Sequence, residues 1–263
     1  MINMMFPKIP SLSALGFMAL VLFSLTSNAQ ENTSTDILTM GNSITAGLAG
    51  NQFGVIRCAA QGNRIVAADN QASCRGNGQQ NVGGWQPILT SLTGSNTFNF
   101  GNSGELTVQM VNRFQAALAQ RPSKYVLILG GTNDVIVNRS RSETIANIQR
   151  MVDLSRAANR IPIVGTIPPL LLGRFASINS RVVELNTQIK ALVDVEVADH
   201  YAVLVTNWGA HNSGDTIHLG SSGNQIVAQG WADAIARLNQ PVEPEPEPTT
   251  GAFSPVLNLL ISD

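Results

Sequence analysis

Short apolar segments alternate with longer amphipathic segments along most of this sequence. The apolar segments have the length and composition of buried strands, and Tyr-Val-Leu-Ile-Leu at residues 125–129 is the clearest of them. The predicted strands are residues 36–40, 97–100, 125–129, 161–165 and 195–199, and the predicted helices are residues 85–92, 106–119, 142–158, 178–192 and 222–238. This alternation predicts an α/β fold in which helices cover both faces of a parallel sheet.

Three long connections between these elements have no clear periodicity. Residues 44–83 are rich in Gly, Asn and Gln, and we expect a loop there. Residues 168–173 (Pro-Pro-Leu-Leu-Leu-Gly) are expected to form a surface or cleft loop, and residues 200–220 a loop that leads into the last helix.

The first 29 residues have the pattern of an export signal. Lys8 is their only charge, residues 12–25 are apolar, and Ser27-Asn28-Ala29 has the small-x-small form of a cleavage site. The alternative is an uncleaved membrane anchor, but an apolar run of about 14 residues is shorter than the roughly 20 that span a bilayer. We therefore expect a mature, secreted or periplasmic protein that begins at Gln30 and has no transmembrane span.

The other end of the chain differs in composition from the domain before it. Residues 241–248 alternate Pro with Glu or Val, which excludes a helix or a central strand and predicts an extended linker. Residues 252–263 are too few for a domain, and the choice between a docking or sorting tail and the remnant of an appended module stays open. The domain itself is expected to occupy residues 30–240, and residues 241–263 are expected to form the linker and tail.

Charge and motifs exclude several functions. The chain has 16 Lys and Arg against 17 Asp and Glu, so no basic surface for nucleic acid or an anionic membrane is expected. Neither phosphate-binding glycine motif, G-x-G-x-x-G or G-x-x-x-x-G-K-[ST], is present, which argues against a nucleotide-binding protein.

The two cysteines, Cys58 and Cys74, are close in sequence in a chain that we expect to be exported. An even number of cysteines in an oxidising compartment predicts one disulfide, Cys58–Cys74. Neither residue has a second Cys or a His nearby at metal-ligand spacing, so a zinc site is not expected.

Polar residues of complementary chemistry follow the predicted strands. Ser43 comes just after the first strand, where a parallel sheet presents ligands, and it is the candidate nucleophile. Taken alone, Asn42 and Ser43 are better explained as helix caps. Because the carboxyl ends of parallel strands share one edge, Gly104, Asn133, Asp215 and His218 can converge on the same place.

A serine hydroxyl needs a base, and the chain has three histidines. His218 is the best candidate, because Asp215 three residues earlier can bind its other ring nitrogen and set the tautomer. His200 and His211 are the alternatives. The alternative without a catalytic role makes Asp215 a turn or helix cap and His218 a solvated loop residue.

Acyl transfer also needs donors for a developing oxyanion. The main-chain N–H groups of Ser43 and Gly104 and the side-chain amide of Asn133 form a suitable set, and each such donor is worth about 3 kcal/mol in the transition state. A glycine at 104 would leave room for substrate. The alternative without a catalytic role is a turn glycine at 104 and a turn or N-cap at Asn133-Asp134.

Four segments of the chain resemble, in order, the four conserved blocks of the SGNH/GDSL hydrolase superfamily. They are Gly41-Asn42-Ser43-Ile44-Thr45, Asn99-Phe100-Gly101-Asn102-Ser103-Gly104, Gly131-Thr132-Asn133-Asp134 and Asp215-Thr216-Ile217-His218. The resemblance implies a three-layer α/β/α flavodoxin-like sandwich with a five-stranded parallel sheet, and a metal-independent ester hydrolase without a cofactor.

Carried over by position, the resemblance assigns the same roles as the chemistry. Ser43 is the nucleophile, Asp215 and His218 complete a catalytic triad, and Gly104 and Asn133 join the Ser43 N–H as oxyanion donors. One departure is Asn42, where the family usually has Asp. Asn keeps the hydrogen bonding but loses the charge, so we expect reduced or retuned rather than abolished activity.

The leading functional hypothesis is a secreted serine esterase that works through an acyl-serine intermediate. The segments Met-Gly-Asn-Ser-Ile-Thr and Gly83-Gly84-Trp85 are similar to those of carbohydrate acetylesterases, which favours an acylated carbohydrate as the ester substrate. The main alternative is a lipase, lysophospholipase or thioesterase on longer acyl chains, suggested by apolar residues 168–172. A non-catalytic binding domain that uses the same cleft is an alternative of another class.

Overall fold

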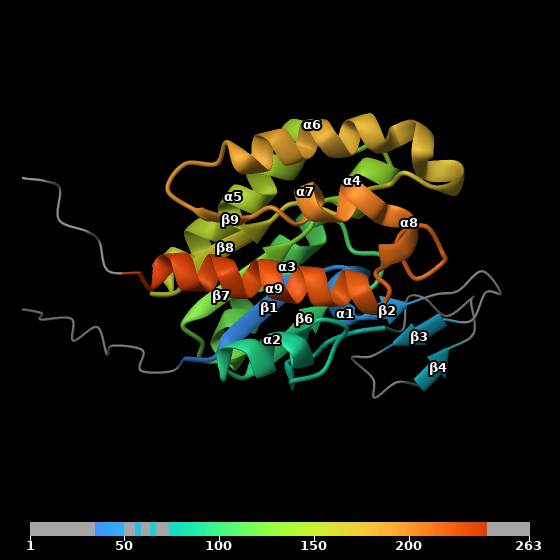
Figure 1. Ribbon diagram of the computed structural model, residues 1–263. Helices are drawn as coiled ribbons and strands as arrows, with labels where there is room; N and C mark the ends of the chain where they lie inside the picture. The colour runs from blue at the N-terminus through green and yellow to red at the C-terminus, as the bar shows by residue number, and fades with distance from the viewer. Residues whose placement is uncertain (1–34, 50–55, 59–63, 67–73, 241–263) are drawn as a thin grey trace, which may run out of the picture. The chain divides into compact units, whose positions relative to one another are not determined.

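The computed structural model describes residues 35–49, 56–58, 64–66 and 74–240 (Figure 1). The predicted signal segment, most of the expected loop between 50 and 73, and the linker and tail at 241–263 lie outside these residues. In the described part, no helix combines the length and the apolar character needed to cross a membrane.

A six-stranded sheet forms the centre of the fold. Its strands are, in spatial order, β5 (Gln79–Gln80), β6 (Thr97–Gly101), β1 (Ile37–Gly41), β7 (Tyr125–Leu129), β8 (Ile161–Gly165) and β9 (Glu196–Ala198). The last five pair in parallel, and β5 is an antiparallel edge strand. The prediction of five parallel strands is thus confirmed. β5 was not predicted, because a strand of two residues has no periodicity to detect.

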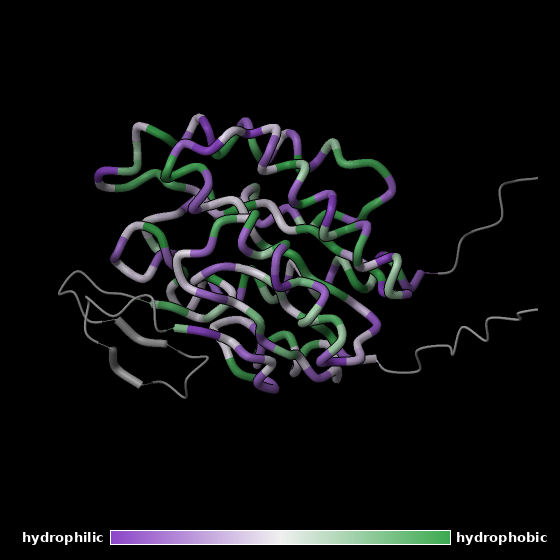
Figure 2. The backbone as a smooth tube through the Cα atoms, turned by 180° about the vertical axis from the view of Figure 1, so that it is seen from behind, coloured by the Kyte–Doolittle hydropathy of each residue, from purple (hydrophilic) through white to green (hydrophobic). Residues whose placement is uncertain are grey.

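Helices cover both faces of this sheet, as Figure 1 shows. α3 (Thr107–Gln120), α5 (Arg141–Ala157) and α6 (Asn179–Lys190) form one layer, and α2 (Gln86–Thr93) and α9 (Ser221–Leu238) form the other. Purple and green segments alternate along the helices in Figure 2, as expected for helices with one buried face.

The side chains of each strand divide between two apolar cores. Leu38 and Met40 of β1 pack with the α3 and α5 layer, whereas Ile37 packs with the α2 and α9 layer, where Trp85 and Trp231 are fully buried. Successive residues of a strand point to opposite faces, so a strand buried on both faces is mainly apolar, as β7 is throughout. This explains the continuous apolar runs in the sequence.

The long helices begin and end close to the predicted positions. α2 ends at Gly94, whose left-handed φ of 70° is typical of a glycine C-cap. α5 begins at Arg141, just before the predicted start, because the Ser140 side chain accepts a hydrogen bond from the Glu143 N–H and caps the helix.

Two of the three predicted loops contain regular structure. The segment expected to be a loop at 44–83 includes α1 (Ser43–Ala46) and a small antiparallel sheet of β2 (Leu48–Ala49), β3 (Ile56–Cys58) and β4 (Arg64–Val66). The segment 200–220 includes α7 (His200–Leu204), the 3₁₀ turn η4 (Val205–Asn207) and α8 (Trp208–His211). These predictions were wrong because elements this short are held by tertiary packing, as the buried Leu204 and Trp208 show.

The third predicted loop is largely correct. Residues 166–172 have no helix or strand, and the 3₁₀ helix η3 (Gly173–Ile178) follows them before α6. Two of their apolar side chains, however, turn inward, since Ile167 and Leu170 are fully buried in the core, whereas Leu171 is exposed.

Candidate active site

β1 delivers Ser43 to the carboxyl edge of the sheet. A Cβ atom on Gly41 would lie 2.0 Å from Thr45 Oγ1, so only glycine allows α1 to fold back so tightly over the strand end. Asn42 caps α1, because its Oδ1 accepts a hydrogen bond of 3.0 Å from the Ile44 N–H. The capping interpretation therefore holds for Asn42 and leaves the Ser43 hydroxyl available for another partner.

That partner is His218, which lies in the loop before α9. The Ser43 Oγ lies 2.8 Å from His218 Nε2, and His218 Nδ1 lies 2.6 Å from Asp215 Oδ2. The other carboxylate oxygen of Asp215 accepts hydrogen bonds from the main-chain N–H groups of Ile217 (3.1 Å) and His218 (2.8 Å). Hydroxyl, imidazole and carboxylate thus form one continuous hydrogen-bonded chain.

The turn that makes these contacts has an unusual backbone. Thr216 has a φ of 74°, in the left-handed region that β-branched residues rarely adopt. This turn directs the next two main-chain N–H groups at the carboxylate of Asp215. The loop is closed on itself by a hydrogen bond of 2.8 Å from the Ser213 N–H to the His218 carbonyl.

The surroundings keep Asp215 ionised. Burial raises its pKa, but the hydrogen bonds and charge of His218 together with the Ile217 N–H lower it more, so the net pKa is well below the ordinary value. A carboxylate that stays charged holds the proton of the imidazole on Nδ1 and leaves Nε2 free to accept the serine proton.

The other two histidines are elsewhere. His200 is buried and packs edge-on against Trp231, with ring centroids 4.5 Å apart, and neither of its ring nitrogens has a hydrogen-bond partner among the described residues. His211 Nδ1 lies 3.1 Å from Ser222 Oγ. Of the three candidate bases, His218 is the one hydrogen-bonded to Ser43.

The predicted oxyanion donors follow the neighbouring strands at the same edge. β6 and β7 flank β1, with Gly101 and Leu129 both opposite Gly41. Gly104 therefore follows one neighbour of β1, and Asn133, in the short helix α4 (Thr132–Ile136), follows the other. As the first residue of α1, Ser43 has a main-chain N–H without a partner inside the helix.

The structure gives a conformational reason for glycine at 104. Its φ is 78°, and a Cβ placed there would meet no atom of the described structure within 4 Å. The turn itself thus favours glycine. The expectation that glycine leaves room for substrate stays a prediction.

Asn133 and Asp134 have distinct contacts. The Asn133 Nδ2 donates a hydrogen bond of 2.9 Å to the main-chain carbonyl of Glu105, which fixes the orientation of the amide. The buried carboxylate of Asp134 accepts hydrogen bonds from Thr107 Oγ1 (2.7 Å) and the Thr107 N–H (3.0 Å), joining α4 to the start of α3. Asp134 therefore satisfies the first N–H of α3, a contact of the kind that a helix cap makes.

Sequence reasoning missed Glu105 and Arg113, which lie beside these groups. The two side chains form an ion pair, and Arg113 also binds main-chain carbonyls at the ends of β1 and β6. A Glu before a helix with an Arg two turns into it was the available signal. Glu and Arg are both common on exposed surfaces, so the pattern alone does not indicate a site.

The predicted disulfide stays a prediction. Cys74 is buried. The Cys58 side chain lies outside the described residues, although the main chain of Cys58 pairs with Leu48 in the small sheet.

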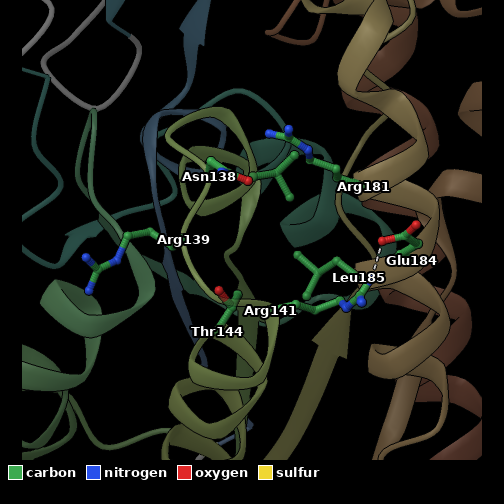
Figure 3. Close-up of a pocket in the computed structure, with 8 residues that line it drawn as sticks. Asn138, Arg139, Arg141, Thr144, Arg181, Glu184 and Leu185 are labelled. Atoms are coloured by element: carbon green, nitrogen blue, oxygen red, sulfur yellow. Dashed lines mark hydrogen bonds and ion pairs between the residues drawn. The ribbon is translucent and has the colours of Figure 1, made fainter.

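A separate cavity of about 210 Å³ lies between α6 and the connection from α4 to α5 (Figure 3). Its lining residues are Val135, Asn138, Arg139, Arg141, Thr144, Arg181, Glu184 and Leu185. In Figure 3, Arg141 points to Glu184, with which it forms an ion pair, and Arg139 points away from the other lining side chains. Ser43, Asp215 and His218 are not part of this lining.

Solved structures of other proteins share this fold. A GDSL-like lipase from Bacteroides thetaiotaomicron is 19% identical, with a TM-score of 0.55 over 78% of this chain and 89% of that one. An acetylxylan esterase from Geobacillus stearothermophilus is 17% identical, with a TM-score of 0.54 over 76% of this chain and 94% of that one. A lipolytic protein of the G-D-S-L family from Veillonella parvula is 18% identical, with a TM-score of 0.56 over 77% of this chain and 98% of that one.

Sequence comparison gives the family. A search of curated proteins found no match. Residues 39–226, which include every candidate site residue, match the family model described as GDSL-like Lipase/Acylhydrolase. The chain therefore belongs to the GDSL-like lipase/acylhydrolase family and is a carboxylic ester hydrolase.

Proposed function

We propose that this protein is a secreted serine esterase that removes acetyl or other short acyl groups from a carbohydrate through an acyl-serine intermediate. The observation that carries the proposal is the hydrogen-bonded chain from Ser43 Oγ to His218 Nε2 and from His218 Nδ1 to Asp215. Ser43 is the nucleophile, His218 the general base and acid, and Asp215 the residue that orients the imidazole.

The first half of the reaction transfers the acyl group to the enzyme. Ser43 Oγ attacks the ester carbonyl carbon while its proton passes to His218 Nε2, and the carbonyl oxygen becomes an oxyanion. The N–H groups of Ser43 and Gly104 and the Asn133 amide stabilise that charge. The intermediate then collapses: the bond to the leaving alcohol breaks, and His218 returns the proton to the alcohol oxygen.

The second half releases the acyl group. Water loses a proton to His218 and attacks the acyl-serine carbonyl, and the new tetrahedral intermediate uses the same donors. Its collapse breaks the bond to Ser43 Oγ, which recovers a proton from His218. The products are one alcohol and one carboxylic acid, and the enzyme returns to its starting state.

Two observations favour a short acyl group over a long chain. The apolar residues 168–172, which suggested a lipase, bury Leu170 in the core and expose mainly Leu171, at 37%. An acyl-chain groove would need several apolar side chains facing solvent. One protein of similar fold is described as an acetylxylan esterase, which supports acetylated polysaccharide as the substrate class.

Trp85 does not belong to a sugar-binding surface, although its segment was similar to that of carbohydrate acetylesterases. The Trp85 ring is fully buried, with its centroid 5.9 Å from that of Trp231. Carbohydrate contacts must therefore come from other residues.

Hydrolysis of p-nitrophenyl acetate and p-nitrophenyl palmitate by the wild type and by Ser43→Ala tests the proposal. We expect the wild type to prefer acetate and Ser43→Ala to lose about 10³-fold or more in kcat. Ser180→Ala, at an exposed position of α6, is the control and should keep wild-type activity. Equal turnover by Ser43→Ala and the wild type would refute the nucleophile, and a strong preference for palmitate would favour the lipase alternative.

Two further measurements address the natural substrate and export. Acetate released from acetylated xylan, pectin and peptidoglycan identifies the polymer. Sequencing the amino terminus of the protein purified from culture medium or periplasm should find Gln30, because residues 1–29 have the pattern of a cleavable signal. Protein retained in the membrane fraction with residues 1–29 attached would contradict export by cleavage.

A further inference from the structure

One ion pair, together with the main-chain carbonyl of one of its members, connects the three segments that carry the oxyanion donors. Arg113 Nε lies 2.8 Å from Glu105 Oε1 and 2.9 Å from Oε2, and Arg113 Nη2 lies 2.5 Å from Oε2. The side chains of Glu105 and Arg113 are only 14% and 23% exposed. A fork of this kind holds a carboxylate in a defined orientation as well as attracting it.

Arg113 reaches the ends of two strands. Its Nη2 donates hydrogen bonds to the carbonyls of Phe100 (2.7 Å) and Gly41 (3.3 Å). Phe100 belongs to β6, which leads to Gly104. Gly41 ends β1, two residues before Ser43. A single guanidinium therefore binds both chain segments at the point where they leave the sheet.

Glu105 supplies the connection to the third donor. It directly follows Gly104, its Oε1 accepts a hydrogen bond of 3.0 Å from Asn102 Nδ2, and its main-chain carbonyl accepts one of 2.9 Å from Asn133 Nδ2. The amide of Asn133 has two N–H bonds. Holding one of them on the Glu105 carbonyl sets the direction of the other.

We propose that Glu105 and Arg113 are positioning residues that set the geometry of the oxyanion donors Ser43, Gly104 and Asn133. The inference rests on the proposed function, since it assigns the pair to the oxyanion site of that reaction. Neither side chain is assigned a contact with substrate. The pair acts by keeping the turn at 102–105 and the end of β1 in one relative arrangement.

This role makes a specific kinetic prediction. Charge on the carbonyl oxygen develops only in the transition state, so donors that are misplaced weaken transition-state binding more than substrate binding. Loss of the pair should therefore lower kcat and leave KM nearly unchanged. A merely structural ion pair would change the melting temperature and leave the kcat of the folded enzyme unchanged.

The test compares Glu105→Gln, Arg113→Met and Arg113→Lys with the wild type on p-nitrophenyl acetate, at a temperature where circular dichroism shows each variant folded. We expect kcat to fall about tenfold to a hundredfold for Glu105→Gln and Arg113→Met, with KM within about twofold. Arg113→Lys should recover part of the loss, because an ammonium group can bind some of the same oxygens but cannot form the fork.

A second ion pair of the same type provides the matched control. Arg237 Nε lies 2.7 Å from Glu196 Oε1, where the end of α9 meets β9. Arg237→Met and Glu196→Gln should keep the wild-type kcat. If Arg113→Met does not fold, Glu105→Gln is nearly isosteric and carries the test alone.

The second measurement is the affinity for methylboronic acid. Its adduct with the Ser43 oxygen places a negatively charged oxygen in the oxyanion site. The affinity should fall in proportion to kcat in the Glu105 and Arg113 variants. Folded variants with wild-type kcat and adduct affinity would overturn the inference, as would a rise in KM with unchanged kcat. If the Glu105 and Arg113 variants behave like the wild type while Ser43→Ala is inactive in the same assays, the inference about the positioning pair fails and the proposed function stands. Full activity of Ser43→Ala would instead refute the proposed function and the inference with it.

Discussion

The hydroxyl oxygen of Ser43 lies 2.8 Å from Nε2 of His218, although 175 positions separate the two residues in the chain. The contact exists because β1 and the loop before α9 both end at the carboxyl edge of the sheet. Open α/β sheets bind ligands at this edge. In the short turn from Asp215 to His218, local hydrogen bonds are then enough to align the carboxylate of Asp215 with the imidazole.

Replacing the carboxylate of Asp215 tests the orientation of the imidazole. Asp215→Asn can still hydrogen-bond to Nδ1, but an amide N–H there favours the tautomer that carries its proton on Nε2. We expect kcat to fall by roughly 10²- to 10⁴-fold with a far-ultraviolet circular dichroism spectrum like that of the wild type. A loss of less than about threefold in steady-state kinetics would remove Asp215 from the mechanism.

His200 should make the protein sensitive to acid. Burial lowers its pKa from 6.5 to about 3, with Asp199 opposing the shift, so the folded state holds it neutral. Its contribution to stability is complete above pH 6.5, where the unfolded chain is also neutral. It is lost as the pH falls from 6.5 toward 3, because only the unfolded chain binds the proton. The loss is about 1.4 kcal/mol per pH unit in that window.

Urea unfolding at pH 7.0 and pH 4.5 measures this effect. Between pH 7.0 and pH 4.5, the free energy of unfolding of the wild type should fall by roughly 2–3 kcal/mol because of His200. In His200→Leu the fall over the same range should be smaller by this amount. His211→Leu removes a histidine that is hydrogen-bonded to Ser222 and is the control. An unchanged pH dependence in His200→Leu would show that the buried imidazole is not the cause.

Thr216 carries backbone strain that a substitution can relieve. Among the described residues, the other non-glycine residues with positive φ are three Asn and one Asp, which tolerate this conformation. Thr216→Asn should therefore raise the free energy of unfolding by about 1 kcal/mol and leave kcat within about threefold of the wild type. Thr187→Asn, in the helix α6, has no such strain and should not stabilise the protein. Calorimetry of both variants provides the comparison.

Asn42 replaces the Asp usual in the family and caps α1 through its Oδ1. Asn42→Ala should destabilise the protein by about 1 kcal/mol through loss of the cap. Asn42→Asp keeps an acceptor at that place, so activity should stay within about tenfold of the wild type. Thermal unfolding and esterase assays of the two variants separate capping from charge. Equal stability of Asn42→Ala and the wild type would argue against the cap.

Much of the fold could be predicted because it follows from local patterns. The apolar run at 125–129 indicated a strand buried on both faces, and β7 lies at the centre of the parallel strands. Glycine at 94 marked the end of α2. The short helices at 200–211 and the small sheet at 48–66 could not be predicted, because elements of two to five residues depend on the surface that they pack against.

The candidate site divides in the same way. The candidates Ser43, Gly104, Asn133, Asp215 and His218 could be proposed from sequence, because each follows a strand or precedes a helix in a recognisable block. Glu105 and Arg113 could not. Their importance depends on which carbonyl groups lie within reach of one guanidinium, and the sequence does not contain that information.

The amino-acid sequence by itself determined the order of strands and helices, the edge at which polar groups gather and the types of chemistry available there. Periodicity and turn residues act over a few positions, so they can be seen in one dimension. The tertiary structure alone decided the distance between Ser43 and His218, the burial of His200 without a hydrogen-bond partner among the described residues, and which ion pair lies beside the donor segments. Hydrogen bonds form or fail over a few tenths of an ångström, and those distances exist only after the sheet and its helices have packed.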